Sequence, residues 1–317
     1  MNIVVLDGYT LNPGDMDWSP IKAFGNLNVF DRTPVEEVGK IARHADILLT
    51  NKAKVTADAI SQIPNLKYIG ELATGFDNID IVAARKRGIP VCNVPGYSTN
   101  SVAQLAWAYI LEITYHIQSR SDSVHRGDWS NQPDFCYGHG SLVELAGKTL
   151  GVIGLGKIGM AVAQIAIAFG MRVIATVRDP SRYSAPGIQF VSLNECFSTA
   201  DFISLHCPLT DSTREMVNAN LLSLMKPSAY LINTSRGALI KEQDLADALK
   251  SNKIAGAAID VLSKEPPPIE NPLLTAPRCI ITPHIAWSTK ESRRRLLDIS
   301  AENIRAFLNG IPQNVVN

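Results

Sequence analysis

Three side chains in the last third of the chain have the types needed to bind an anion and to move a proton. Arg236 follows the apolar segment AYLIN, Glu265 follows GAAIDV, and His284 follows CIIT. A guanidinium presents a planar fork of donors that suits a carboxylate. A carboxylate bonded to an imidazole raises the pKa of the imidazole, which can then donate a proton near neutral pH. Together the three types indicate proton transfer to an anionic substrate.

The expected places of these residues, at the ends of strands, strengthen this interpretation. Doubly wound parallel sheets bind ligands at the carboxyl ends of their strands. Glu265 precedes three prolines and His284 follows one, so both loops are stiff. Arg236 taken alone is equally compatible with a structural ion pair. Four other histidines lack such a setting and are interpreted as core or surface residues: His44, His116, His125 and His139.

A glycine-rich turn indicates a dinucleotide-binding site. Gly154, Gly156 and Gly159 have the G-x-G-x-x-G spacing, between the apolar segment TLGVI and an amphipathic stretch over 158–169. The first glycine permits a tight turn, the second lets backbone amides approach a pyrophosphate, and the third allows helix and strand to pack closely. The pyrophosphate then lies at the N-terminus of the helix. The context of strand, turn and helix makes the motif specific.

The end of the next apolar segment, RVIAT, predicts which dinucleotide is bound. Where an NAD site places a carboxylate on the ribose, this chain has Val177, followed by Arg178. Arg178 and Arg182, with Ser181, form a suitable set for the additional phosphate of NADP(H). In the alternative, Arg178 faces solvent and Asp179 binds the ribose of NAD(H). Charge complementarity favours NADP(H), with NAD(H) as the second choice.

Alternating short strands and helices are expected to position these residues. A chain of 317 residues fits two domains, and apolar strands recur between helix-length segments such as 158–169 and 242–250. This order predicts an α/β protein with two doubly wound parallel-sheet domains. The segment 93–101, NVPGYSTNS, marks a boundary and precedes a long helix expected over 101–119. The proline-rich segment 264–277 is expected to be an ordered loop.

Composition narrows the function classes. Hydrophobic residues make up 46% and charged residues 19%, and 30 basic residues balance 30 acidic ones. This profile is typical of a globular enzyme and gives no basic excess for nucleic-acid binding. The five cysteines are scattered without a C-x-x-C pair, which argues against a disulfide framework or a metal site. The N-terminus lacks a signal-peptide pattern and no apolar run fits a membrane span, so we expect a cytoplasmic protein.

Over its full length the chain resembles the D-isomer-specific 2-hydroxyacid dehydrogenase family, most closely its glycerate dehydrogenase and hydroxypyruvate reductase branch. The matching segments occur in the order LATGFDNID, NVPGYSTNSVAQ, GKTLGVIGLGKIG, LHCPLTDSTREMVN, MKPSAYLINTSRGALI, AAIDVLSKEP and TPHIAWSTKES. The resemblance implies a Rossmann NAD(P)-binding domain over 100–284 and a discontinuous, flavodoxin-like substrate domain from 1–99 and 285–317. It also implies an active site in the cleft between the domains, and a homodimer.

The resemblance also assigns roles to individual residues. It implies that Arg236 anchors the substrate carboxylate, that Glu265 orients the imidazole, and that His284 is the general acid and base. The other side of the substrate carboxylate is held by the backbone of Ala73, Thr74 and Gly75. The motifs above single out Gly159 and Arg178 as residues that contact the cofactor. The resemblance implies cofactor contacts also at Gly154, Gly156, Lys157, Ile158, Pro208, Thr234 and Asp260. Asp260 is directed at the nicotinamide amide.

The function implied is an NAD(P)-dependent reduction of a small 2-oxo acid, hydroxypyruvate or glyoxylate, to the D-2-hydroxy acid. The alternative is an NAD(H)-sensing, corepressor-like binding protein of the same fold. Formate dehydrogenases of the family carry Gln at the position of Glu265, and phosphoglycerate dehydrogenases usually add a regulatory domain, so both fit less well. In relatives the segment 129–145 is an arm that crosses to the second subunit, where Phe135 and Tyr137 border the partner's cleft. The alternative for these two aromatic residues is plain interface packing.

Overall fold

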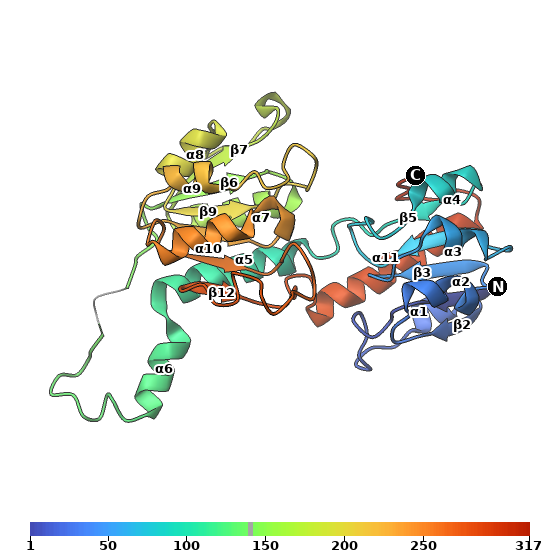
Figure 1. Ribbon diagram of the computed structural model, residues 1–317, viewed down its shortest axis with the longest axis horizontal. Helices are drawn as coiled ribbons and strands as arrows, with labels where there is room; N and C mark the ends of the chain where they lie inside the picture. The colour runs from blue at the N-terminus through green and yellow to red at the C-terminus, as the bar shows by residue number, and fades with distance from the viewer. Residues whose placement is uncertain (139–141) are drawn as a thin grey trace. The chain divides into compact units, whose positions relative to one another are not determined.

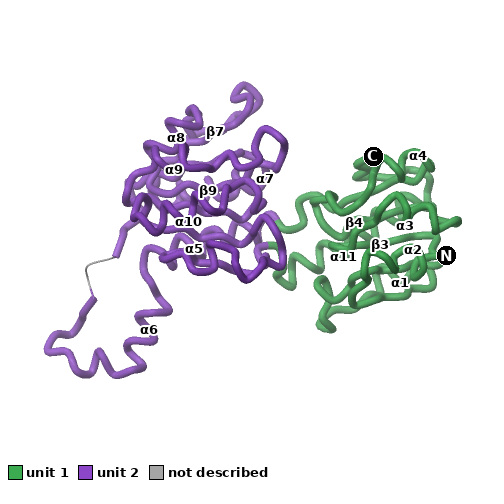
Figure 2. The backbone as a smooth tube through the Cα atoms, in the orientation of Figure 1, with its two compact units in different colours: residues 1–98, 287–317 green, residues 99–286 purple. Residues whose placement is uncertain are grey.

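The computed structural model describes residues 1–138 and 142–317, which divide into two compact units (Figure 2). Unit 1 comprises residues 1–98 and 287–317, and unit 2 comprises residues 99–286. His139, interpreted above as a core or surface histidine, lies outside the described residues. No helix in the described part of the chain is long and apolar enough to cross a membrane.

Unit 1 is a parallel sheet with helices on both faces (Figure 1). Its strands are β1 (Asn2–Val5), β2 (Asn26–Val29), β3 (Ile47–Thr50), β4 (Tyr68–Glu71) and β5 (Val91–Cys92). They pair in the flavodoxin-like order β2-β1-β3-β4-β5. One face packs against α2 (Val38–Ile41), α3 (Ala57–Ser61) and α4 (Ile81–Lys86). The other face packs against α1 (Ser19–Lys22) and α11 (Lys290–Leu308), so the C-terminal helix completes this unit.

Unit 2 has a larger parallel sheet. Its strands within the described residues are β6 (Thr149–Ile153), β7 (Arg172–Thr176), β8 (Ile188–Phe190), β9 (Phe202–Leu205), β10 (Tyr230–Asn233), β11 (Gly256–Ile259) and β12 (Cys279–Ile281). They pair in the order β12-β11-β10-β9-β6-β7-β8, which reverses direction between β6 and β9. In such sheets the ligand binds at this reversal, beyond the carboxyl ends of the strands.

Two layers of helices cover the sheet of unit 2 (Figure 1). One face packs against α5 (Thr99–Tyr115) and α7 (Lys157–Ala168). The other packs against α8 (Leu193–Thr199), α9 (Ala219–Leu224) and α10 (Glu242–Lys250). Side chains of β6 alternate between these layers, Val152 contributing to the first core and Ile153 to the second. All residues of β6 are buried, as expected for a strand covered on both faces.

The predicted α/β class with two doubly wound parallel sheets is confirmed. The proline-rich segment 264–277 contains no strand or helix, in agreement with the prediction of a loop. The prediction of one long helix over 101–119 is wrong. The chain instead forms α5, which ends at Tyr115, and α6 (Ile117–His125), separated by His116 in a left-handed conformation with φ of 51°. A left-handed residue cannot continue a right-handed helix, so the second helix starts in a new direction.

Candidate active site

The three residues singled out for proton transfer follow three neighbouring strands of unit 2. Arg236 follows β10, Glu265 follows β11 and His284 follows β12, with β11 paired between the other two strands. The loop of Arg236 lies against the turn that leads to Glu265. A Cβ placed on Gly237 would lie 1.9 Å from the carbonyl carbon of Leu262, so only glycine permits this approach.

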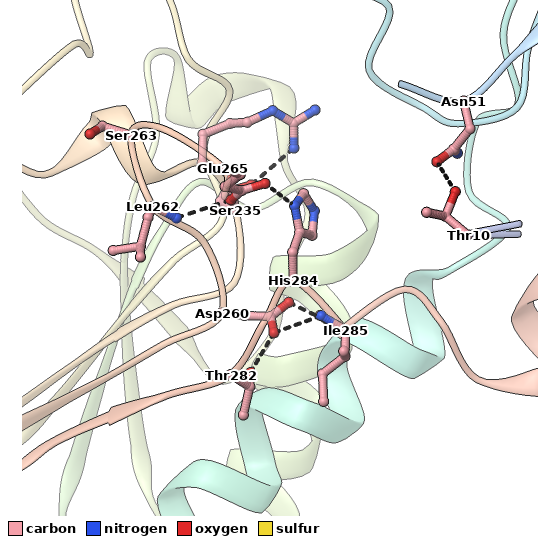
Figure 3. Close-up of polar contacts among 12 residues, drawn as sticks. Thr10, Asn51, Ser235, Asp260, Leu262, Ser263, Glu265, Thr282, His284 and Ile285 are labelled. Carbon is pink, nitrogen blue, oxygen red and sulfur yellow. Dashed lines mark hydrogen bonds and ion pairs between the residues drawn. The ribbon is translucent and has the colours of Figure 1, made fainter. Parts of the chain in front are cut away.

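An ion pair joins His284 to Glu265 (Figure 3). Nδ1 of His284 lies 2.5 Å from Oε2 of Glu265. The second carboxylate oxygen accepts a hydrogen bond from the backbone N–H of Leu262 at 3.0 Å. An ionised carboxylate only accepts hydrogen bonds, so Nδ1 carries a proton and Nε2 is the nitrogen available to a ligand. The side chain of His284 is 25% exposed, which lets a small molecule reach it.

Asp260 holds the loop that carries His284 (Figure 3). One oxygen of its carboxylate accepts from the N–H of Ile285 at 2.8 Å and from the hydroxyl of Thr282 at 2.5 Å. The other accepts from the N–H of Ala286 at 2.8 Å, and the Asp260 carbonyl accepts from the N–H of His284 at 2.8 Å. Burial raises the pKa of Asp260, and these hydrogen bonds oppose the rise. Because both carboxylate oxygens are engaged within the chain, a contact with the nicotinamide amide stays a prediction.

The Arg236 guanidinium has no carboxylate partner in residues 1–138 or 142–317. Its Nη1 donates to the carbonyl of the adjacent Ser235 at 2.9 Å, and the residue is half-buried. The structural ion pair considered as an alternative for Arg236 is therefore not formed in the described chain. A partly buried cation without a counter-ion is well suited to bind an anionic ligand.

The glycine-rich turn joins β6 to α7. Gly154 has φ of 93°, and a side chain there would collide with the backbone that follows β9. A Cβ on Gly159 would lie 2.1 Å from the Gly154 carbonyl oxygen, so this helix lies directly on the turn. Gly156 is the N-cap of α7, with open space around it and no capping side chain. The N–H groups of the first turn, at Lys157 and Ile158, are thus suited to a pyrophosphate.

The end of β7 carries the residues on which the choice of dinucleotide depends. Arg178 and Asp179 are both exposed. The Asp179 carboxylate caps its own turn, accepting from the N–H of Ser181 at 3.1 Å and from its hydroxyl at 2.6 Å. Arg178 and Arg182 form no side-chain hydrogen bond or ion pair within the described residues. Two uncommitted guanidinium groups therefore flank a carboxylate that is already engaged.

Two further residues with a predicted cofactor contact lie at the same edge of the sheet. Pro208 follows β9 and is exposed. Thr234 directly follows β10, and its buried hydroxyl has no hydrogen-bond partner within the described chain. A buried polar group without a partner costs about 1–3 kcal/mol, so a ligand that bonds this hydroxyl is favoured. The orphaned hydroxyl and the uncapped helix α7 both fit a nicotinamide dinucleotide.

In unit 1, the loop after β4 presents backbone donors. The N–H groups of Ala73, Thr74 and Gly75 donate no hydrogen bond within the described residues. The loop itself is fixed, because the Thr74 hydroxyl donates to the carbonyl of Val94 at 2.8 Å and the Asn93 amide donates to the carbonyl of Thr74 at 2.7 Å. Fixed donors without acceptors suit a carboxylate, and this role stays a prediction.

Sequence reasoning missed two polar groups. The Tyr109 hydroxyl of α5 lies 2.5 Å from the hydroxyl of Thr282. In the sequence Tyr109 is one of many apolar and aromatic residues of a helix, and no pattern distinguishes it from core. Glu71, at the end of β4, is 1% exposed, and burial raises its pKa to about 9. Here a signal existed, since a charged residue within the apolar segment KYIGELA directly precedes the loop assigned to the substrate.

Comparison with known proteins decides the family. Residues 107–286 match the family described as "D-isomer specific 2-hydroxyacid dehydrogenase, NAD binding domain". A hydroxypyruvate reductase of Blautia hydrogenotrophica is 47% identical over 325 aligned residues, which cover 100% of both chains. The chain belongs to the D-isomer-specific 2-hydroxyacid dehydrogenase family. As a member, it is an oxidoreductase that acts on CH–OH groups with a nicotinamide cofactor.

Two other relatives agree with this assignment. A glycerate dehydrogenase of Methylorubrum extorquens is 41% identical over 283 aligned residues. The alignment covers 89% of this chain and 88% of the glycerate dehydrogenase. Among solved structures, an acyclic imino acid reductase in complex with NADPH and D-Arg has 34% identity and a TM-score of 0.86, with full coverage of both chains. The predicted resemblance to the glycerate dehydrogenase and hydroxypyruvate reductase branch is confirmed.

Proposed function

We propose that this member of the family reduces a small 2-oxo acid, hydroxypyruvate or glyoxylate, to the D-2-hydroxy acid. The observation that carries the proposal is the Glu265–His284 ion pair, which lies at the same sheet edge as the glycine-rich turn. The substrate is supported by a hydroxypyruvate reductase that is 47% identical over the whole chain. No comparison supports the corepressor alternative.

Arg236 is the proposed anchor of the substrate carboxylate. Its guanidinium has no counter-ion in the described chain and offers paired donors. The backbone N–H groups at 73–75 are proposed to bind the same carboxylate, since they have no acceptor within the described residues. Binding the substrate by its carboxylate fixes the position of its carbonyl group, which lowers the entropy lost in reaching the transition state.

His284 is the proposed proton donor. When bound, a reduced nicotinamide cofactor supplies a hydride. His284 in its protonated form gives the proton on Nε2 to the substrate oxygen, while Nδ1 keeps its hydrogen bond to Glu265. The Glu265 carboxylate stabilises the imidazolium before the transfer and fixes the plane of the ring. In the oxidative direction the same nitrogen accepts the proton.

NADP(H) is the proposed preferred dinucleotide. Arg178 and Arg182 are exposed and uncommitted within the described chain, and they suit a ribose phosphate. Asp179 is engaged with Ser181, which reduces its availability to the ribose of NAD(H). Lys157 and Ile158 are proposed to bind the pyrophosphate through their N–H groups, and Thr234 is proposed to bond the nicotinamide half with its hydroxyl.

A homodimer and a cytoplasmic location are also proposed. The dimer is supported by α6 and the segment that follows it, where Trp129 and Phe135 are 49% and 87% exposed. Exposed aromatic side chains are typical of protein interfaces. The cytoplasmic location is supported by the cysteines, since Cys92, Cys196, Cys207 and Cys279 are free thiols.

The test is the initial rate of hydroxypyruvate and glyoxylate reduction, with NADPH and NADH at equal low concentration. We expect turnover with at least one acid and a preference for NADPH that Arg178→Ala lowers by about tenfold or more. Arg172→Ala, an exposed arginine at the other end of β7, is the matched control. His284→Ala should retain cofactor binding and lose turnover. Absence of turnover with both acids would contradict the proposed function, and NADH preference would assign the ribose to Asp179.

A further inference from the structure

Helix α5 braces the His284 loop at two points that the proposed chemistry does not use. The Tyr109 hydroxyl lies 2.5 Å from the Thr282 hydroxyl, on one side of His284. On the other side, the Ser101 hydroxyl donates to the carbonyl of Ala286 at 2.5 Å. The helix thus fixes both ends of the short loop whose centre is the proposed proton donor.

The hydroxyl chain from Tyr109 to Asp260 has one direction. The Thr282 hydroxyl donates its one proton to the Asp260 carboxylate, so its oxygen in turn accepts from the Tyr109 hydroxyl. Tyr109 is 3% exposed, and burial raises its pKa, so the phenol keeps its proton. Each hydrogen bond polarises the next in the same sense, which strengthens the bond that reaches the carboxylate.

The Asp260 carboxylate depends on these donors because it is 1% exposed. Removing one donor leaves a buried carboxylate oxygen short of a hydrogen bond, and the carboxylate must then shift. The same carboxylate holds the N–H groups of Ile285 and Ala286, which directly follow His284. His284 has φ of 54°, a left-handed conformation that a residue with a side chain keeps only when its surroundings enforce it. A shift of Asp260 therefore moves the backbone of His284.

We propose that Tyr109 and Thr282 are positioning residues that fix the Asp260 carboxylate and, through it, the direction in which His284 presents its imidazole. This inference rests on the proposed role of His284 as proton donor. Neither hydroxyl bonds to the Glu265–His284 pair within the described residues. Their removal is therefore expected to change turnover and to leave substrate binding nearly unchanged.

Tyr109→Phe and Thr282→Val each remove one hydroxyl and keep the shape of the side chain. We expect each variant to lower kcat by about tenfold or more, with a KM for the 2-oxo acid within about twofold of wild type. Thr282→Ser keeps the hydroxyl, so it should retain most of the wild-type kcat that Thr282→Val loses. Because Tyr109 acts through Thr282, the double variant should lose no more than Thr282→Val alone. Tyr230→Phe, in the same unit, removes a hydroxyl that forms no hydrogen bond in the described chain and is the control.

Wild-type kcat in Tyr109→Phe, a loss confined to KM, or additive losses in the double variant would overturn the positioning role. A wild type that reduces no 2-oxo acid would overturn the proposed function instead. In that case the hydroxyl chain is tested by the NMR signals of the His284 ring, assigned with His284→Ala. These signals should shift in Tyr109→Phe and not in Tyr230→Phe, and unshifted signals in both would overturn the inference.

Discussion

At the scale of single residues, the candidate site places a cation that has no counter-ion in the described residues beside an ion pair. Glu265 pairs with His284, whereas within residues 1–138 and 142–317 the Arg236 guanidinium bonds only to the carbonyl of Ser235. This difference separates the two roles in the proposed reaction, because the paired imidazole can move a proton and the unpaired guanidinium can bind an anion. Substitutions at the two positions should therefore affect different kinetic constants.

Arg236→Ala is expected to raise the KM for the 2-oxo acid by about 100-fold, because a charge-assisted contact contributes roughly 1.5–3 kcal/mol. Arg236→Lys keeps the charge without the planar fork and should give an intermediate KM. Steady-state kinetics at saturating dinucleotide measure both effects. Arg214→Ala removes an exposed arginine of the same unit and serves as the control. An unchanged KM in Arg236→Ala would place the carboxylate at another site.

Glu71 makes the stability of the protein depend on pH. Burial raises the pKa of its carboxyl from 4.5 to about 9, and Asn78 and Lys52 only partly oppose the rise. The unfolded chain ionises Glu71 at the lower pKa, so the folded state loses stability as pH rises from about 4.5 toward 9. The steepest loss from one group is about 1.4 kcal/mol per pH unit.

Glu71→Gln removes this titration. We expect the variant to match wild type near pH 5 and to exceed its free energy of unfolding by about 1 kcal/mol or more at pH 8. Urea unfolding at the two pH values measures the difference. Glu36→Gln, an exposed glutamate of the same unit, should show no such divergence. Parallel pH dependence of Glu71→Gln and wild type would mean that the carboxyl is ionised in the folded chain.

At the scale of elements, the sequence predicts where strands end but not which side chains meet. Arg236, Glu265 and His284 could be predicted because each follows an apolar segment, and parallel strands bring their carboxyl ends to one edge. The contact of Tyr109 with Thr282 spans 173 residues and depends on how α5 lies across the sheet, which no local pattern encodes. The end of α5 at residue 115 was missed for a similar reason, since no breaker residue marks it.

The packing of α7 on β6 sets the position of the proposed pyrophosphate donors. Gly159→Ala places a Cβ 2.1 Å from the Gly154 carbonyl oxygen, so the helix must move away from the turn. We expect a stability loss of about 1–3 kcal/mol together with weaker dinucleotide binding. In Gly156→Ala the added methyl group meets open space at the N-terminus of α7, where the pyrophosphate is proposed to bind. This variant should therefore keep the stability of wild type and bind the dinucleotide more weakly. Urea unfolding and dinucleotide titration separate the two effects, and equal stability of both variants would contradict this packing argument.

At the scale of the whole molecule, exposed apolar side chains lie at the start of α6 and in the segment after it. Ile117, Trp129 and Phe135 are 61%, 49% and 87% exposed, and α6 extends away from the sheet of unit 2 (Figure 1). Exposure of apolar side chains to water is unfavourable. A second copy of the chain that covered these side chains would remove their apolar surface from water. In the proposed homodimer, the second subunit covers these exposed side chains.

Phe135→Ser and Ile117→Ser are expected to weaken the homodimer, because each replaces a side chain that contributes about 1.5–3 kcal/mol when it is fully buried. Light scattering across a range of protein concentrations should show a dimer in wild type and a shift toward monomer in the variants. Val82→Ser makes a comparable polar change at a 59% exposed position of α4 and should leave the mass unchanged. Equal shifts in all three variants would point to general destabilisation, and a monomeric wild type would contradict the dimer itself.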